Sequence, residues 1–328
     1  MRKYVLKRIL LSIIILFFVT FIIYTLMRCL PTSYIENMAL QKSMQPNSKS
    51  YEEWMEQLTE LYNMNGGIVT GFFKWWGQML RGEFGDSWFW TVPVVEEFKI
   101  TVPLSFWMGL ISMFLELIIA IPLGIVAARK QYSRTDYAIS VIALAGISLP
   151  TFFFASLVKL VFCVKLKWFE LFGLVSKNFD RMTPTQQFWD KAWHLVLPIT
   201  VLVVISIGSL MRYTRTNMLE VLNADYIRTA RAKGLSERKV IYKHAFRNTL
   251  IPLVTIIGGS LPGLFSGALI TETLFSIPGI GYASYHAMVA GDIPFSMFYL
   301  TFIAVLTLLG NLIADVLYAV VDPRVRIA

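Results

Sequence analysis

Residues 102–127 read VPLSFWMGLISMFLELIIAIPLGIVA, and Glu116 is the only charged side chain among them. A helix needs about 20 apolar residues to cross the hydrocarbon core of a bilayer, which is about 30 Å thick. The stretch is long enough and apolar enough, so we predict that it is a transmembrane helix. The composition agrees, because 56% of the chain is hydrophobic and only 16% is charged, against about 25% charged in soluble domains.

Five further apolar segments flank this stretch, one before it and four after it. They are residues 10–26, 137–161, 196–211, 251–275 and 295–321. The first follows a basic tail, as the apolar part of a signal peptide does, but it is too long for that and no small-residue cleavage site follows it. We therefore expect it to be retained, and we predict an all-α integral membrane protein with about six transmembrane helices.

Lysine and arginine residues gather on one side of these spans. They lie in the amino-terminal tail, in the connection between the second and third spans, in the loop 212–248 and in the carboxyl-terminal tail. Because cytoplasmic loops carry the excess of basic residues, this side is predicted to be the cytoplasm, with both termini on it. The net charge of +9 then reports topology, and we expect no nucleic acid as a partner. The predicted location is the cell membrane.

These assignments divide the chain into four parts. A cytoplasmic tail (1–8) precedes the first span (9–30), an extracytoplasmic segment follows (31–101), and residues 102–328 form a core with the other five spans. The extracytoplasmic segment contains an amphipathic stretch, residues 72–80, with two tryptophans soon after it. Indole rings favour the headgroup region, so anchoring at the interface is the simpler interpretation, and contact with a substrate is the alternative.

The loop 212–248 has the sequence features of a structured segment. Asn223 is a good N-cap, and Asp225 would lie in the first turn of the helix that follows, where its charge is favourable. Gly234 can adopt the positive φ that ends such a helix. Ser236 would then cap a second helix, which continues towards the fifth span.

One face of the first short helix is small and apolar. Tyr226, Ile227, Ala230 and Gly234 share it through their three- and four-residue spacings, and basic side chains surround it. Such a helix suits docking into a groove on a partner protein. The same features suit a surface helix that lies on anionic lipid headgroups, and the residues alone leave both interpretations open.

Several motifs along the chain resemble those of one family. They are DYIRTARAKGLS (225–236), HAFRN (244–248) followed by Pro252, GISLP (146–150), ETLFSIPGIG (272–281), and DVLY (315–318) followed by DPR (322–324). The chain resembles the permease subunits of ATP-binding-cassette (ABC) importers of the peptide/nickel family, in particular the B-type membrane subunit of oligopeptide and dipeptide importers. The resemblance implies the type I ABC importer permease (MetI-like) fold.

The resemblance also implies partners. A homologous second permease subunit would complete the pathway, two cytoplasmic ABC ATPase subunits would drive it, and an extracytoplasmic substrate-binding protein would deliver the substrate. The chain has no Gly-x-x-x-x-Gly-Lys-Ser/Thr phosphate loop, so we expect it not to be an enzyme and to bind no cofactor. ATP and magnesium would bind to the ATPase subunits. Oligopeptides or dipeptides are the expected substrate, with nickel chelates, glutathione and oligosaccharides as alternatives.

The family resemblance assigns the contact with the ATPases to the short helix in the loop. The predicted coupling residues are Asp225, Tyr226, Ile227, Arg228, Thr229, Ala230, Arg231, Ala232, Lys233 and Gly234. The general importer pattern is Glu-Ala-Ala, three residues and then Gly, and only Ala230 and Gly234 keep their types here. We expect close approach to an ATPase at these two positions.

A second group of residues is predicted to lie along the translocation pathway. They are Glu116, Gly259, Pro262, Gly263, Gly267 and Glu272. Small residues at four-residue spacing let helices approach closely, so the glycines also have a purely packing interpretation. Glu116 is the most central ionisable residue of its span, where a charge is costly. Lys159 is expected to extend its ammonium group to the outer membrane surface.

We expect no metal site, because the three histidines are far apart in the topology and Cys29 and Cys163 lack metal-ligand spacing. Two other functions fit less well than an importer. In a secondary transporter, Glu116 and Asp315 would bind protons or sodium, but the chain shows no internal repeat and the basic loop would have no role. A membrane enzyme would need a catalytic motif, and neither Gly-x-Ser-x-Gly nor His-Glu-x-x-His occurs.

Overall fold

The structure is a computed structural model that describes residues 2–29, 34–45, 48–61 and 66–321. Within these ranges the chain is helical and has no strand beyond a single β-bridge. The α-helices are α1 (Arg2–Cys29), α2 (Tyr34–Ser43), α3 (Tyr51–Leu61), α4 (Ile68–Leu80), α5 (Val94–Arg129), α6 (Arg134–Ser148), α7 (Thr151–Lys159), α8 (Pro184–Leu222), α9 (Asp225–Ala232), α10 (Glu237–Lys239), α11 (Phe246–Ser266), α12 (Leu269–Phe275), α13 (Ile280–Ala290) and α14 (Ile293–Val321). Two π-helical turns and one 3-10 turn complete them: η1 (Leu160–Lys165), η3 (Val240–Ala245) and η2 (Phe179–Arg181).

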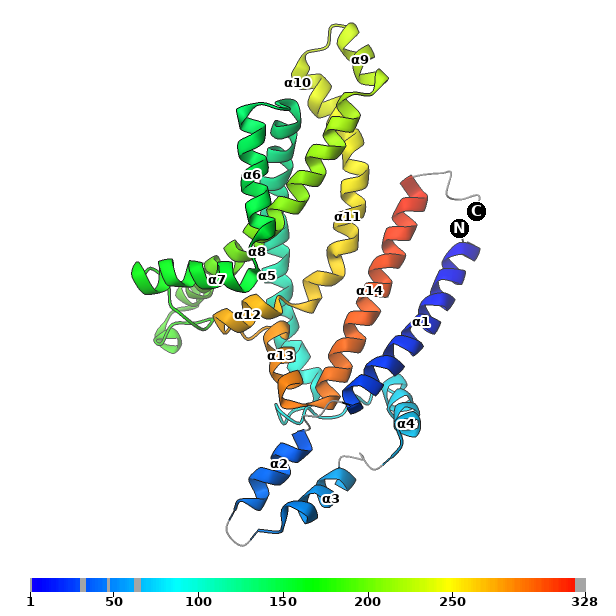
Figure 1. Ribbon diagram of the computed structural model, residues 1–328, viewed down its shortest axis with the longest axis vertical. Coiled ribbons are helices and arrows are strands. Elements are labelled where there is room, and N and C mark those ends of the chain that lie inside the picture. The colour runs from blue at the N-terminus through cyan, green and yellow to red at the C-terminus, as the bar shows by residue number, and fades with distance from the viewer. Residues whose placement is uncertain (1, 30–33, 46–47, 62–65, 322–328) are drawn as a thin grey trace.

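Four of these helices are long and apolar enough to cross a membrane by themselves, within the described part of the chain. Two bent pairs raise the number of crossing segments to six: α6 with α7, bent by 100°, and α11 and α12 with α13, bent by 77°. The molecule is elongated, with α9 and α10 at one end and α2 and α3 at the other (Figure 1). The predictions of an all-α membrane protein and of about six crossing segments are therefore confirmed.

The predicted third span, residues 137–161, consists of two helices that meet at a sharp bend. α6 ends at Ser148 because Pro150 disfavours helical backbone at the residue before it, and Leu149 is extended with φ −81° and ψ 123°. α7 starts directly after Pro150 and runs sideways from the other helices (Figure 1). The predicted segment 137–161 therefore contains a break that its hydrophobicity did not reveal.

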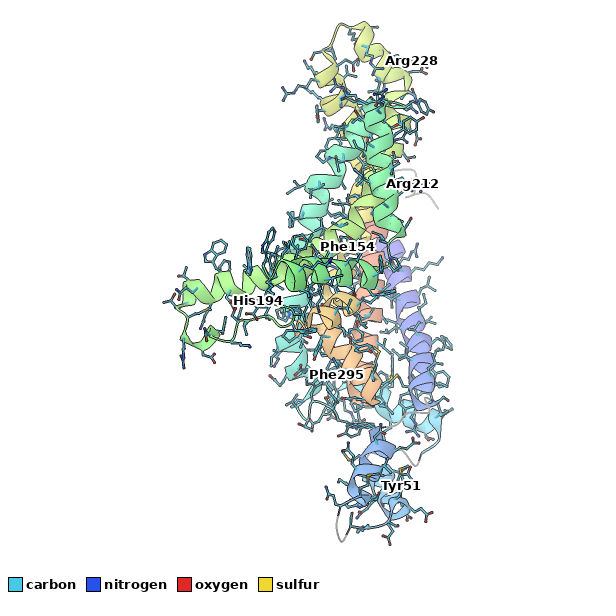
Figure 2. The ribbon with its side chains drawn as sticks, turned by 60° about the vertical axis from the view of Figure 1, so that its left-hand side comes forward. Tyr51, Phe154, His194, Arg212, Arg228 and Phe295 are labelled. Carbon is cyan, nitrogen blue, oxygen red and sulfur yellow. The ribbon has the colours of Figure 1, made fainter. Side chains whose placement is uncertain are left out.

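The fourth span is much longer than the stretch 196–211 predicted for it, because α8 has 39 residues. It starts with a capping box, in which Thr183 and Gln186 each accept a hydrogen bond from the other's backbone N–H. Its first part lies in a lateral arm with α7, where Figure 2 shows His194, and its last part reaches the α9 end of the molecule. Hydrophobicity had located only the apolar middle of this helix.

α5, α6 and α8 are in close contact at small residues. A Cβ atom at Gly124 of α5 would lie 2.7 Å from Thr214 Cβ and 2.8 Å from the Met211 carbonyl oxygen, both on α8. A Cβ atom at Gly208 of α8 would lie 2.7 Å from Ile147 Cγ1 on α6. Within a bilayer, helices associate mainly through such packing, because lipid tails are as apolar as the side chains.

α1 and α14 lie side by side along one flank of the molecule (Figure 1). Near their ends, Tyr24, Met27 and Met297 are buried together with Phe72 of α4. α4 covers the amphipathic stretch predicted at residues 72–80, and it turns Phe72 inward while Leu80 stays exposed. The stretch is thus a helix whose aromatic side chains anchor it on α1 and α14, with Phe72 the most deeply buried.

A fully buried carboxylate, that of Glu272, joins the segments that meet where α11, α12 and α13 break. Its Oε1 atom accepts hydrogen bonds from Ser105 Oγ and from the N–H of Ala268, both at 2.8 Å, and Oε2 accepts one from the N–H of Tyr282 at 3.0 Å. Ser105 Oγ also accepts one from the N–H of Ile280 at 2.9 Å. The amides at the start of α12 and α13 have no partner in their own helices, and these side chains supply one.

Three glycines let the chain close around this carboxylate. Gly267, between α11 and α12, has a φ of +76°, which residues with a side chain rarely adopt. A Cβ atom at Gly279 would lie 2.5 Å from Glu272 Oε2, and one at Gly281 would lie 2.9 Å from the same atom. The motif ETLFSIPGIG (272–281) therefore contains both the carboxylate and two glycines, Gly279 and Gly281, whose lack of a side chain leaves space for it.

A bidentate ion pair joins α6 to α8 closer to the α9 end. Arg215 donates from Nε and Nη2 to the two carboxylate oxygens of Asp136, each at 2.7 Å, and the Asp136 side chain is only 3% exposed. The backbone N–H of Tyr132 also donates to this carboxylate, at 3.0 Å. Two parallel charge-assisted bonds fix both the distance and the rotation of the two helices.

We expect Glu272→Gln to lower the free energy of unfolding by about 1–3 kcal/mol, because the new amide nitrogen would face N–H or O–H donors in place of an acceptor oxygen. Thermal unfolding of the detergent-solubilised chain measures this. Glu220→Gln, an exposed carboxylate on α8, is the matched control and should leave the unfolding unchanged. Equal stability of the two variants would contradict the role of Glu272.

Arg215→Met should destabilise the chain by about 2 kcal/mol, because it leaves the buried carboxylate of Asp136 without its charged donor. The same unfolding measurement applies, with Arg212→Met as the control at an exposed arginine of the same helix. Adding Asp136→Asn to Arg215→Met should recover part of the loss, since the unpaired charge is then removed. Additive losses in the double variant would show that the pair is not coupled.

Candidate functional site

A cavity of about 200 Å³ lies between α5, α8, α11 and the break after α11; we call it the central cavity. Its lining is Ser105, Met108, Gly109, Ser112, Met113 and Glu116 from α5, Leu202 and Ser206 from α8, and Ser260, Gly263, Leu264, Gly267 and Ala268 from α11 and the break. The predicted pathway residues Glu116, Gly263 and Gly267 are thus brought together. Gly259, Pro262 and Glu272 do not line it.

The predicted place of Glu272 on the translocation pathway has to be corrected, because this residue does not line the cavity. It is completely buried, and its carboxylate is occupied by donors from Ser105 and from two backbone amides. Glu272 therefore stabilises Ser105 and Ala268, which line the central cavity, but it is not exposed to the cavity itself. Pro262 also has a packing role, because its ring lies against Gly310 of α14, where a Cβ atom would be 2.9 Å from Pro262 Cδ.

The glycines of α11 differ from one another. A Cβ atom at Gly259 or at Gly263 would meet nothing within 4 Å, and both residues are exposed. The packing interpretation therefore has no support within this chain at these two positions. Gly267 is different, because its positive φ and the nearness of Gly281 both require the absence of a side chain. The exposed glycines leave one face of α11 bare beside the cavity.

Among the residues that the structure describes, Glu116 is the only ionisable side chain that lines the central cavity. It is half-buried, and within the described part of the chain no hydrogen bond or ion pair joins its carboxylate to another residue. A charged group at mid-span is costly, and such groups usually pair with one another or mark the path of a substrate or ion. The side chain of Asp315, the other acid considered for such a role, lies outside the described part of the structure.

Lys159 does not extend to the membrane surface as predicted. Its side chain is buried, and Nζ donates to the carbonyl oxygen of Leu274 near the end of α12. The rings of Phe172 and Phe275 lie 3.9 and 5.2 Å from Nζ. The aromatic faces and the carboxyl end of a helix both favour a cation, so the lysine ties α7 to α12.

The described residues contain neither a candidate metal site nor a disulfide bond. No group of three or more His, Cys, Asp or Glu side chains there could hold a metal ion. Cys29 is exposed, Cys163 is buried, and both are free.

The first part of the predicted loop 212–248 belongs to α8, which ends at Leu222, and the segment that follows folds at the far end of the molecule, where Figure 2 shows Arg228. α9 spans Asp225–Ala232, and Gly234 follows with a φ of +73°, so the predicted helix and its glycine terminator are confirmed. The predicted N-caps are corrected. Asn223 ends α8, Ala224 precedes α9 without a capping side chain, and Ser236 precedes α10 without a side-chain cap bond.

Of the four residues predicted to share the apolar face of α9, Ile227 and Ala230 are directed towards the chain itself, whereas Tyr226 and Gly234 are exposed. Ile227 is fully buried and Ala230 is 6% exposed, in a cluster that contains Met218 of α8 and Val240 and Ile241 of η3. The expectation of close approach to a partner at Ala230 is therefore wrong for this face, since the space around it is filled. Burial of this face instead fixes how α9 is held on the molecule.

The outward surface of α9, which we call the tip surface, consists of the remaining predicted coupling residues. They are Asp225, Tyr226, Arg228, Thr229, Arg231, Ala232, Lys233 and Gly234, all exposed. Arg231 donates to Glu237 at 2.8 Å, and Arg228 lies 3.6 Å from Asp225, so both guanidinium groups are oriented by neighbouring acids. Tyr226, 47% exposed, is a large aromatic side chain in the midst of these charges.

Sequence reasoning missed the serines of the central cavity. On α5, Ser105, Ser112 and Glu116 are separated by seven and four residues, which places them on one helix face. That spacing was visible in the sequence, but a serine within an apolar span was not distinguished from a packing residue. A further contact that was missed joins the loop after α4 to the start of α14, where Ser87 Oγ and the N–H of Phe89 donate to Asp292.

Comparison with known proteins places the chain in a family. The family model described as binding-protein-dependent transport system inner membrane component matches residues 120–327. The oligopeptide transport system permease protein AppB of Bacillus subtilis (strain 168) is 37% identical over 327 residues, which are 99% of this chain and 100% of the relative. The dipeptide transport system permease protein DppB of Alkalihalophilus pseudofirmus is 33% identical over 99% of this chain and 100% of its own length. The oligopeptide transport system permease protein OppB of Salmonella typhimurium is 31% identical with the same two coverages. The chain belongs to the family of inner membrane components of binding-protein-dependent transport systems.

Proposed function

We propose that the chain is the permease subunit of an ABC importer for oligopeptides or dipeptides. The observation that carries this is similarity over the full length to relatives that are named peptide permeases. A homologous second permease forms the pathway with this chain, and an extracytoplasmic binding protein delivers the peptide. Two cytoplasmic ATPase subunits bind ATP and magnesium and supply the energy.

The orientation in the membrane follows from the distribution of basic residues. The end with α9 carries Arg228, Arg231 and Lys233 on its surface, so this end is the cytoplasmic one. The start of α1 and the end of α14 both point towards that end (Figure 1), which supports cytoplasmic termini. α2, α3 and α4 then lie outside, on the side from which a binding protein approaches.

The tip surface is the contact with the ATPases, and the fold provides a direct connection from it to the central cavity. α9 packs through Ile227 and Ala230 on η3, and η3 continues without a break into α11. α11 in turn lines the cavity with Ser260 and Gly263. A π-helical turn is a common feature of functional sites in helices, and η3 lies between the cluster beneath α9 and the start of α11.

Reconstitution tests the proposed function directly. Proteoliposomes that hold this chain with a homologous permease, ATPase subunits and a binding protein should take up radiolabelled tri-alanine only when ATP is supplied. Uptake by this chain alone, without any response to ATP, would instead indicate a secondary transporter. Nickel chelates, glutathione and oligosaccharides, supplied with binding proteins specific for them, test the other substrates of the importer class.

We expect Tyr226→Ala and Arg228→Glu each to lower ATP-driven uptake by about tenfold. Tyrosine and arginine side chains that become buried when two proteins bind carry much of the affinity of the interface. ATP hydrolysis by the ATPase subunits should continue but no longer respond to the loaded binding protein. The two activities are measured in the same proteoliposomes.

Two controls separate docking from folding in this experiment. Arg129→Glu changes an exposed basic residue at the end of α5, outside the tip surface, and should leave uptake unchanged. Ala230→Leu should instead reduce the thermal stability of the chain by about 1–3 kcal/mol, because it overfills the cluster beneath α9. If Tyr226→Ala and Arg228→Glu transport normally, the tip surface is not the ATPase contact.

A further inference from the structure

The serine hydroxyls of the central cavity are already used as donors. Ser112 Oγ donates to the carbonyl oxygen of Met108 at 2.8 Å, and Ser206 Oγ donates to that of Leu202 at 2.9 Å. Ser260 Oγ and Ser105 Oγ donate at 2.8 Å, to the Ile257 carbonyl and to Glu272 respectively. A hydroxyl has one proton and two lone pairs, so while these donations are kept each of these oxygens can only accept a further hydrogen bond.

The remaining side chains of the cavity add acceptors and no donors. Glu116 accepts through both oxygens when it is ionised. The other lining residues are glycine, alanine, leucine and methionine, and neither lysine, arginine nor histidine is among them. The side chains around the cavity therefore present several acceptor oxygens and one negative charge.

Such a lining selects for a particular chemical group. A primary ammonium group carries one positive charge and three N–H donors, which matches a carboxylate flanked by hydroxyl oxygens. A carboxylate ligand, such as the carboxyl end of a peptide, would meet like charge, and a serine hydroxyl could donate to it only by giving up its present acceptor. The charge on Glu116, which no described residue neutralises, is then compensated when the ligand is present.

The size of the cavity limits how much of a ligand it holds. Pockets for drug-sized molecules measure roughly 300–1,000 Å³, whereas this one measures about 200 Å³. It opens along α11, where Ser260 and Gly263 are exposed and Gly259 leaves the helix surface bare. The space therefore suits one end of a peptide, with the remainder on the open side of α11.

We propose that the central cavity is a transit site for the primary ammonium group of a peptide, bound by Glu116 with Ser112, Ser206 and Ser260. The proposal rests on the proposed function, since it requires a peptide to pass this chain. The ammonium group has two sources, the amino terminus of the peptide or the side chain of a lysine within it. Both present the same chemistry to the cavity, and the choice of peptide distinguishes them.

The test compares three radiolabelled peptides in the reconstituted importer: tri-alanine, N-acetyl-tri-alanine and N-acetyl-Ala-Lys-Ala. Each is supplied at a concentration that saturates the binding protein, and uptake by the Glu116→Gln variant is divided by wild-type uptake of the same peptide. We expect a fall of tenfold or more for tri-alanine and a ratio near one for N-acetyl-tri-alanine. A fall for N-acetyl-Ala-Lys-Ala as well would show that a lysine side chain can serve as the source.

Glu96→Gln is the matched control, because it removes an exposed carboxylate from the same helix, and it should leave all ratios near one. Ser260→Ala is a second variant in case Glu116→Gln fails to assemble, and it should show the same peptide order with a smaller fall, about threefold. Equal loss for all three peptides, or no loss for tri-alanine, would overturn the proposal. Absence of ATP-driven uptake of any peptide by the wild-type chain would overturn the proposed function instead.

Discussion

The carboxylate of Glu272 and its donors are the interaction on which the interior of this protein depends. A bilayer offers no water to satisfy backbone amides, so a helix can break within it only where the protein itself supplies partners. Glu272 and Ser105 do so for the amides at the start of α12 and α13, and they connect that break to α5. The central cavity exists because the chain can turn at this point without leaving polar groups unpaired.

The same break ends the helix that connects the two proposed sites. α11 begins at η3, beneath the tip surface, and ends at Gly267, beside the central cavity. α11 is thus the single helix that connects the cluster beneath α9 to the cavity wall that contains Ser260. Lys159 joins α7 to the end of α12, whereas Glu272 joins the break to α5. The Asp136–Arg215 pair fixes α6 against α8.

Much of the architecture could be predicted because the signals are local. Membrane crossing depends on the hydrophobicity of a continuous segment, and residues 102–127 carry that property alone. Gly234 ends α9 because positive φ is a property of the residue itself, and the break at Pro150 follows from a local steric rule, although the prediction had passed over it. The motifs that resemble importer permeases could likewise be recognised without the structure, and the family comparison agreed with them.

The roles of individual side chains were decided by the tertiary structure. Ile227 and Ala230 form an apolar face in the sequence, but only the positions of η3 and α8 determine that this face is covered by the same chain. Glu116 and Glu272 are both acids in apolar surroundings, yet one faces a cavity and the other is enclosed by donors. The sequence by itself determined which segments are apolar enough to cross the membrane and where α9 ends, since these depend on neighbouring residues. Which polar groups are left free for a ligand or a partner depends on contacts between distant segments, and only the folded chain specifies those.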